Sequence, residues 1–234
     1  MAKIRNLLII SAHADDHIAC AGTVFKLEKE SGFNSYELIF TNSELGQDYK
    51  AKTEIDPKTV LKTRAKELNK ASKFLGIKRS FSLNQSDLGL TYSKDLVFET
   101  VKIIRKLEPE IVFLHNQYDA HPDHNEAFKI GLTAIKIAAM GIKKETLGKP
   151  FRVLMVLCCE GMLPIKTQIL IDISKYSNQK TKLFKIYKSQ ASSKAIIFEK
   201  GLAQIRGYHL RKENSLFAEA FSLQEEFPII LFEK

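Results

Sequence analysis

Short apolar runs alternate with helix-length segments along much of this chain. Such alternation predicts strands joined by crossover helices, which build a mostly parallel sheet with helices on both faces. We therefore expect an α/β, three-layer Rossmann-like fold in a single domain over residues 1–234, with its site at the carboxyl ends of the strands. The expected strands are residues 4–10, 36–41, 80–83, 111–115, 153–159 and 168–173, and the expected helices are residues 16–30, 57–75, 95–107, 123–140 and 175–190.

Composition places the chain among ordinary globular proteins. Of its 234 residues, 44% are hydrophobic and 27% are charged, as is usual for a folded domain. Neither a run long enough to span a bilayer nor the apolar region of a signal peptide occurs, so we expect no membrane span and a cytoplasmic location. The cysteines Cys20, Cys158 and Cys159 form no CxxC pair, which predicts buried small side chains rather than a thiolate metal site.

The net charge of +9 raises the question of a nucleic-acid partner. The lysines are scattered, and the sequence has no arginine-rich block, zinc-finger spacing or aromatic RNP-like strand. We therefore interpret the charge as a solvated basic face that also steers anionic substrates, and expect no nucleic-acid partner.

The turn after the first strand argues against a dinucleotide cofactor. It reads Ser-Ala-His-Ala-Asp-Asp over residues 11–16, without the glycines whose amides would cradle a pyrophosphate. Two carboxylates at this point would repel phosphate, whereas the same crevice suits a cation.

Two acidic histidine clusters follow expected strands. The first is His-Ala-Asp-Asp-His over residues 13–17, and the second is His-Pro-Asp-His over residues 121–124. Helix capping explains the aspartates, but five of the six histidines also fall in or beside the clusters, namely His13, His17, His115, His121 and His124. Two histidines and one aspartate would hold a divalent metal and leave a position open for water, as catalytic sites do.

These clusters resemble the LmbE/PIG-L family of zinc-dependent N-acetylglucosaminyl deacetylases, whose patterns A-H-x-D-D and H-P-D-H match residues 12–16 and 121–124. Weaker similarities occur in the same order along nearly the whole chain. They are the R-x-x-E helix at Arg64, Glu67 and Ala71, the D-I-S…K…S-Q stretch at residues 172–174, Lys182 and residues 189–190, and A-E-x-F at residues 218–221.

The resemblance implies a role for each matching residue. His13, Asp16 and His124 would bind Zn²⁺ or another divalent transition metal, and Asp15 would be the general base. His121 would stabilise the oxyanion or act as the acid, and Asp123 would orient His121. Glu44, Arg64 and Asp87 would contact sugar hydroxyls, and relatives of this kind suggest a homo-oligomer.

Two positions depart from the family pattern. Ala14 replaces the usual proline, which removes no donor or ligand, and His17 replaces the usual glutamate. His17 has three alternatives: an outer partner of the metal ligands, a substrate contact or an additional ligand.

The expected function is zinc-dependent removal of the N-acetyl group from a small N-acetylglucosamine-containing substrate, with release of acetate. One alternative is an amidase that acts on another sugar or thiol conjugate. Another is a non-catalytic metal- or sugar-binding protein, against which the intact Asp15 argues because a binder needs no general base.

Overall fold

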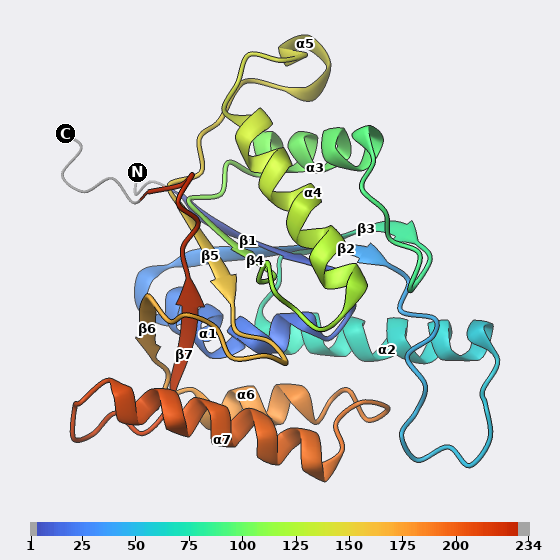
Figure 1. Ribbon diagram of the computed structural model, residues 1–234, viewed down its shortest axis with the longest axis vertical. Coiled ribbons are helices and arrows are strands. Elements are labelled where there is room, and N and C mark those ends of the chain that lie inside the picture. The colour runs from blue at the N-terminus through green and yellow to red at the C-terminus, as the bar shows by residue number, and fades with distance from the viewer. Residues whose placement is uncertain (1–3, 229–234) are drawn as a thin grey trace.

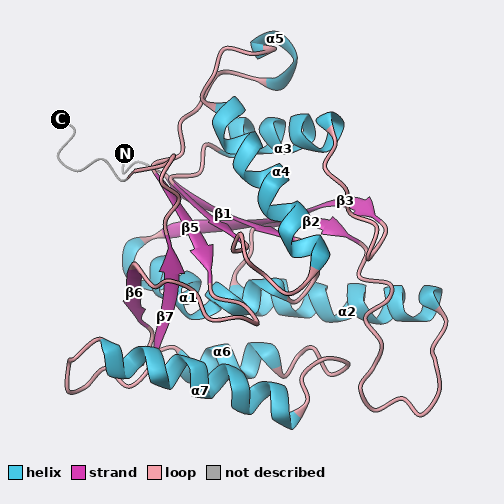
Figure 2. Ribbon diagram, in the orientation of Figure 1, coloured by secondary structure: helices cyan, strands magenta, loops and turns pink. Residues whose placement is uncertain are grey.

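The computed structural model describes residues 4–228 and has a seven-stranded sheet in the order β3-β2-β1-β4-β5-β7-β6 (Figures 1 and 2). β7 is antiparallel to both of its neighbours, and the other pairs are parallel. The expected α/β fold with a mostly parallel sheet is therefore confirmed. The strands are β1 (Arg5–Ser11), β2 (Phe33–Thr41), β3 (Arg79–Gln85), β4 (Ile111–Leu114), β5 (Met155–Cys159), β6 (Ile169–Asp172) and β7 (Ala218–Ser222).

Helices cover both faces of the sheet. In Figure 1, α3 and α4 lie on one side, and α1 and α2 lie on the other, with α6 and α7 beyond them. The helices are the 3-10 helix η1 (Asp16–Cys20), α1 (Ala21–Ser31), α2 (Pro57–Leu75), α3 (Lys94–Leu107), α4 (Pro122–Ala138), α5 (Lys144–Leu147), α6 (Ser177–Phe184) and α7 (Ser193–His209).

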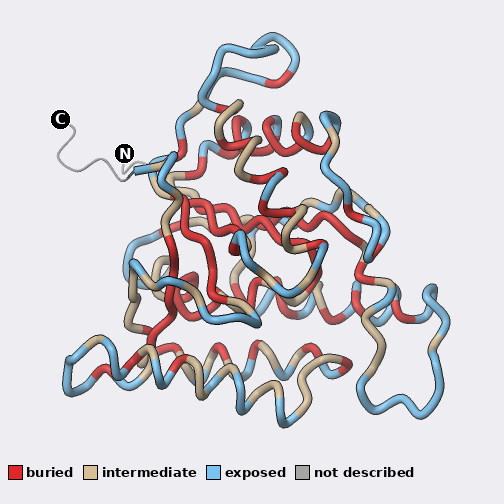
Figure 3. The backbone as a smooth tube through the Cα atoms, viewed as in Figure 1, coloured by how far each residue is buried: buried red, intermediate tan, exposed pale blue. Residues whose placement is uncertain are grey.

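The central strand β1 is buried on both faces of the sheet, which explains its uninterrupted run of apolar residues. Leu8 and Ile10 belong to the core cluster under α3 and α4, and Leu7 and Ile9 belong to the cluster on the opposite face. A strand that is buried on both faces has no polar side. Figure 3 shows the central strands as buried chain, and α5 and the loop after β2 as largely exposed.

The ends of α2 follow the signals in its sequence. The Asp56 carboxylate accepts a hydrogen bond of 3.0 Å from the Thr59 amide, and Pro57 begins the helix. Gly76 ends it in the left-handed region, with φ of +94°, a conformation that glycine adopts without strain.

Two expected helices differ from the structure. The segment at residues 16–30 begins as η1, whose tighter turn lets the Asp16 carboxylate accept a 2.6 Å hydrogen bond from the His13 amide. The helix expected over residues 175–190 ends at Phe184, because the following turns carry Ser189 inward, where its amide and hydroxyl donate to Glu67 at 2.8 and 2.6 Å.

The last strand anchors the first helix. The buried Glu219 of β7 accepts hydrogen bonds from the amides of Gly22 and Thr23, at 2.9 and 2.7 Å, where α1 begins. Lys180 of α6 lies 2.8 Å from the same carboxylate. A residue near the end of the described chain thus satisfies free amides of the helix behind the first cluster.

The three cysteines are free and buried, as expected. Within residues 4–228, no helix combines the length and apolar character needed to cross a bilayer.

Candidate metal centre

The two histidine clusters meet because their strands are neighbours. β1 and β4 pair in parallel, with Leu7 opposite Ile111, so the segments that follow them emerge at one edge of the sheet. As a result, His13 Nδ1 lies 3.2 Å from His124 Nε2, although 111 residues separate them.

The three predicted metal ligands come together at this edge. His13 Nδ1 lies 3.6 Å from Asp16 Oδ2, and His124 Nε2 lies 3.3 Å from Asp16 Oδ1. Imidazole nitrogens and a carboxylate are donors that zinc takes in proteins, so the residues fit the expected metal.

The cluster also holds donors beyond the predicted three. Ring nitrogens of His13, His121 and His124 lie within 4.8 Å of one another, and so do donor atoms of Asp16, His115 and His124. His115 Nε2 is 3.1 Å from Asp16 Oδ2. No role was assigned to His115 from sequence, although it directly follows a strand that leads to the second cluster.

Carboxylates lie beside the outer nitrogens of the two histidines that are predicted as ligands. Asp119 Oδ1 lies 3.0 Å from His124 Nδ1. Asp87 Oδ1 and Asp123 Oδ2 lie 3.1 and 3.2 Å from His13 Nε2. This arrangement of metal-facing imidazole and outer carboxylate is the usual way to fix the orientation of a ligand histidine.

Asp123 occupies a different place from the one its predicted role requires. Its carboxylate accepts hydrogen bonds from the amides of Leu88 and Leu90, at 2.8 and 3.3 Å, and faces His13. With His121 it forms a 3.2 Å hydrogen bond from the Asp123 amide to Nδ1. The side chain of Asp123 therefore faces His13, and its hydrogen bond with His121 comes from the backbone amide.

The carboxylates make the centre strongly attractive to cations. Burial lowers the pKa of His13, but Asp16 and Asp87 outweigh burial and raise it to about 11. Burial likewise lowers the pKa of His124, and Asp16 and Asp119 raise it to about 10. A field that stabilises imidazolium this strongly also favours a divalent cation, whose binding displaces those protons.

His121 has a different electrostatic setting. Burial, with His13 and His124, lowers its pKa, which keeps the ring neutral. Because Nδ1 accepts the amide hydrogen bond of Asp123, the proton of the neutral ring lies on Nε2. His121 therefore presents an N–H donor at the centre.

The predicted base and one predicted sugar contact form a pair. The guanidinium of Arg64 donates a hydrogen bond to the Asp15 carboxylate. Burial lowers the pKa of Arg64, but the charge of Asp15 outweighs burial and raises it. Arg64 is buried, whereas the Asp15 side chain keeps 23% of its surface exposed. Asp15 is thus held in place and still reachable by water.

Glu44 and Asp87, the other predicted sugar contacts, lie together beside the centre. Glu44 Oε1 accepts hydrogen bonds from the Asp87 amide at 3.0 Å and from the Ser86 hydroxyl at 2.9 Å. Asp87 Oδ2 accepts one from the Leu45 amide at 3.2 Å. They form an acidic edge next to His13.

His17 turns away from the centre. Its Nδ1 lies 2.9 Å from Glu37 Oε2, and its Nε2 lies 3.1 Å from the hydroxyl of Tyr187. The Tyr187 hydroxyl also donates to the carbonyl of Ala14. His17 is buried and, among the described residues, belongs to none of the donor groups that could hold a metal.

Comparison with known proteins identifies relatives. The PIG-L family, described as GlcNAc-PI de-N-acetylase, matches residues 8–135. Diacetylchitobiose deacetylase of Thermococcus kodakarensis is 30% identical over 141 residues, which is 58% of this chain and 51% of that protein. A 4-oxalmesaconate hydratase of Pseudomonas putida is 28% identical over 152 residues, 62% of this chain and 58% of that protein.

The chain therefore spans only a little over half the length of these curated relatives. Structural similarity covers more of the chain than sequence similarity does. The N,N'-diacetylchitobiose deacetylase of Pyrococcus horikoshii, solved with its inhibitor MPG, superposes with a TM-score of 0.83 at 21% identity, covering 97% of this chain and 87% of that one.

Proposed function

Because this chain belongs to the PIG-L family, which matches more than half of it, we propose that it is a zinc-dependent hydrolase acting on an N-acetylated amino sugar. The reaction is removal of the N-acetyl group from an N-acetylglucosamine-containing substrate, with release of acetate. Diacetylchitobiose deacetylase, at 30% identity, is the relative whose name supports this substrate class.

One observation carries the proposal. A donor group of His13, Asp16 and His124 is flanked by a carboxylate held on Arg64 and by a neutral imidazole. Hydrolysis of an amide needs a base for water and a hydrogen-bond donor for the oxygen that becomes negative. Asp15 and His121 supply these two groups on residues adjacent to the donor group.

The metal, once held by His13, Asp16 and His124, would acidify a water and polarise the acyl oxygen. Asp15 accepts the proton of the attacking water, and its pairing with Arg64 fixes its position. His121 donates Nε2–H to the developing oxyanion. Since a neutral imidazole is a weak acid, Asp15 is the group that returns the proton to the leaving nitrogen.

A second candidate function is hydration of an organic acid, because the Pseudomonas relative is named as a hydratase. Both reactions need an activated water. The surroundings favour the amide, however, because Glu44 and Asp87 would repel an anionic substrate, and Arg64 is already paired with Asp15. An assay of 4-oxalmesaconate, followed by its ultraviolet absorbance, compares the two directly.

The test is acetate release by protein that is first stripped of metal and then given zinc, with cobalt and manganese in parallel. N-Acetylglucosamine, its disaccharide and N-acetylglucosaminyl conjugates serve as substrates. Zinc-dependent release supports the proposal, and zinc binding in the absence of release from every substrate contradicts it. The homo-oligomer stays a prediction, which the mass of the native protein in solution tests.

A further inference from the structure

A groove on the surface between α2 and α6 is lined by positive charge. Its volume is about 380 Å³, and none of the described residues that line it belongs to the donor groups of the metal centre. Five exposed lysines line it: Lys66 and Lys70 of α2, Lys182 of α6, and Lys185 and Lys188 of the turns that follow α6. We call the cavity that these five residues line the lysine groove.

The lysines of the groove lack the carboxylate partners that other lysines of this chain have. Elsewhere, exposed lysines pair with nearby glutamates, as Lys102 does with Glu99 at 4.0 Å. Within residues 4–228, no ion pair or hydrogen bond occupies any of the five ammonium groups of the groove. The local sequence offers few acids for such pairs, because residues 57–75 and 177–192 contain nine lysines and a single acidic residue, Glu67.

Glu67 does not neutralise these lysines, although it is the one acidic side chain among the described residues that line the groove. It is buried, and its carboxylate accepts hydrogen bonds from the amide and the hydroxyl of Ser189, at 2.8 and 2.6 Å. Its Oε2 also lies 3.8 Å from Nη1 of the buried Arg64. The negative charge of Glu67 is therefore used inside the protein, and the rim of the groove stays positive.

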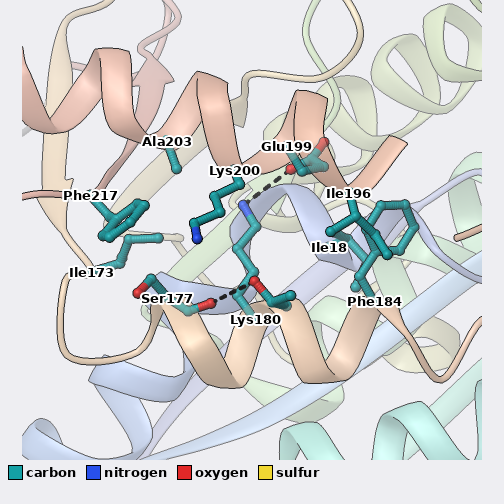
Figure 4. A pocket seen from close by; sticks show the side chains of 11 residues that line it. Ile18, Ile173, Ser177, Lys180, Phe184, Ile196, Glu199, Lys200, Ala203 and Phe217 are labelled. Atoms are coloured by element: carbon teal, nitrogen blue, oxygen red, sulfur yellow. Dashed lines mark hydrogen bonds and ion pairs between the residues drawn. The ribbon is translucent and has the colours of Figure 1, made fainter. Parts of the chain in front are cut away.

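Lys180, on the same helix as Lys182, has a different position. Its ammonium group lies between α6 and α7, 3.4 Å from Glu199 (Figure 4), and it also lies 2.8 Å from Glu219. Lys180 is buried and paired, whereas Lys182 is exposed and has no such partner in the described part of the chain. The lysine that α6 needs for packing is thus on its inner side, and the lysines of the groove remain available to a ligand.

Gathering like charges around one concavity costs stability unless an anion neutralises them. Lys66 and Lys70 are four residues apart on α2, a spacing at which two like charges on a helix repel each other. Lys182 and Lys185 add positive charge from α6 and the turn after it. Lysine binds phosphate as a compact point charge, whereas the planar fork of arginine suits carboxylates as well. The described lining of the groove contains lysine and no arginine.

We propose that the lysine groove binds a small ligand that carries several phosphate groups close together. This site goes beyond the proposed function and does not depend on it. The volume of about 380 Å³ equals that of roughly a dozen waters at about 30 Å³ each, which leaves room for a short phosphate chain. Such a chain has two possible sources, a free inorganic polyphosphate or the phosphates of a nucleotide.

The experiment measures calorimetrically how inorganic tripolyphosphate binds to the zinc-loaded protein, with pyrophosphate, orthophosphate and ATP in parallel. Affinity should rise with each added phosphate and should fall as salt is raised from about 0.05 M to about 0.3 M, because exposed charges are screened. Tighter binding of ATP than of tripolyphosphate identifies a nucleotide as the source, and the reverse identifies the free chain. Absence of saturable binding of both at the lower salt concentration overturns the proposal.

Two double variants with the same loss of charge locate the ligand. Lys66→Gln/Lys70→Gln removes two donors from the groove, so affinity for tripolyphosphate should fall by about tenfold or more. Lys102→Gln/Lys106→Gln is the matched control, because these exposed lysines have the same spacing on α3, which covers the other face of the sheet. An equal loss in the two variants would reduce the effect to net charge and overturn the groove.

The metal centre is the competing site, because phosphates also bind metal ions. The titration is therefore repeated with metal-free protein and with His13→Ala, which lacks a proposed ligand. Binding that survives in both and is lost in Lys66→Gln/Lys70→Gln supports the groove, whether or not the protein releases acetate. Binding that disappears with zinc overturns the proposal, and so does binding of a short DNA duplex without any binding of tripolyphosphate.

Discussion

His13 and His17 lie four residues apart in one cluster and serve two different environments. His13 faces Asp16, Asp87 and His124 at the edge of the sheet, where its ring is part of a donor group for a metal. His17 is completely enclosed and faces Glu37. The same side chain is thus a candidate ligand in one place and an internal hydrogen-bond partner in the other.

The comparison of His13 with His17 shows that the carboxylates around a histidine decide what its ring can do. Glu37 of β2 accepts hydrogen bonds from His17 and from the hydroxyls of Ser72 and Ser80. This buried carboxylate therefore has its hydrogen-bond partners inside the protein. A glutamate at position 17, usual in the family, would place two carboxylates together here. His17 and Glu37 therefore suit each other, and the departure at position 17 leaves the metal donors intact.

Asp15, which lies between His13 and His17, is expected to give the largest effect on activity. Asp15→Asn keeps the shape and removes the base, so turnover should fall by about 10²–10⁴. Zinc content, measured by metal analysis, should stay unchanged because Asp15 is not among the proposed ligands. Turnover equal to that of the wild type would remove Asp15 from the mechanism.

Removing each histidine tests the comparison itself. His13→Ala deletes a proposed ligand, so zinc affinity should weaken by more than the roughly 10–100-fold typical of an outer partner. His17→Gln should change zinc affinity less than about threefold, because its ring faces Glu37. Competition with a chromophoric chelator measures both, and similar losses in the two variants would erase the distinction between them.

The outer carboxylates should have an intermediate effect. Asp119→Asn loses the charge 3.0 Å from His124 Nδ1, and zinc affinity should fall by roughly 10–100-fold. Asp95→Asn, an exposed position in the first turn of α3, is the control. The same chelator titration decides, and an unchanged affinity in Asp119→Asn would show that His124 needs no such support.

The enclosed histidine should instead affect stability. His17→Gln weakens a hydrogen bond to a buried carboxylate, so the free energy of unfolding should fall by about 1.5–3 kcal/mol. Guanidinium unfolding of the metal-free protein measures the change, with the exposed His209→Gln as control. A loss of the same size in the control would mean that the enclosed contact contributes nothing specific.

The smallest effect concerns pH. Burial raises the pKa of Glu37, but the hydrogen bonds from His17, Ser72 and Ser80 outweigh burial and lower it below 4.5. Its carboxylate therefore stabilises the folded state above that pH, and the contribution disappears as pH falls through the lowered pKa. The stability difference between wild type and Glu37→Gln should shrink as the pH falls from above 4.5 through the lowered pKa of Glu37, and a constant difference would contradict this assignment.

Sequence predicted the first half of the fold well because its signals are local. The strands β1 and β4 contain continuous apolar runs, and α2 carries its own cap, proline and terminal glycine. α7 and β7 escaped prediction. Ile197, Phe198 and Ile205 of α7 are exposed, so the helix lacks a clear apolar face, and β7 contains the buried Glu219, whose partners are far away in the chain.

The candidate site also has features that the sequence predicts and features that depend on distant parts of the chain. Strand ends and cluster composition predict that the two clusters meet, and the resemblance to the family selects His13, Asp16 and His124 among their residues. Which carboxylate supports which ring depends on loop paths, so the side chain of Asp123 faces His13 rather than His121. The direction of His17 depends on Glu37, twenty residues later on a neighbouring strand, and no local pattern encodes that pairing.

The hydrogen bonds between Glu219 and the amides at the start of α1 have a consequence for synthesis of the chain. Gly22 emerges from the ribosome long before Glu219, which follows it by 197 positions. At about 5–20 residues per second, the helix behind the first cluster waits on the order of ten seconds or more for the residue that caps it. A nascent chain stalled before β7 would hold both histidine clusters and yet lack that anchor, so the helix behind the first cluster gains these two hydrogen bonds only late in synthesis.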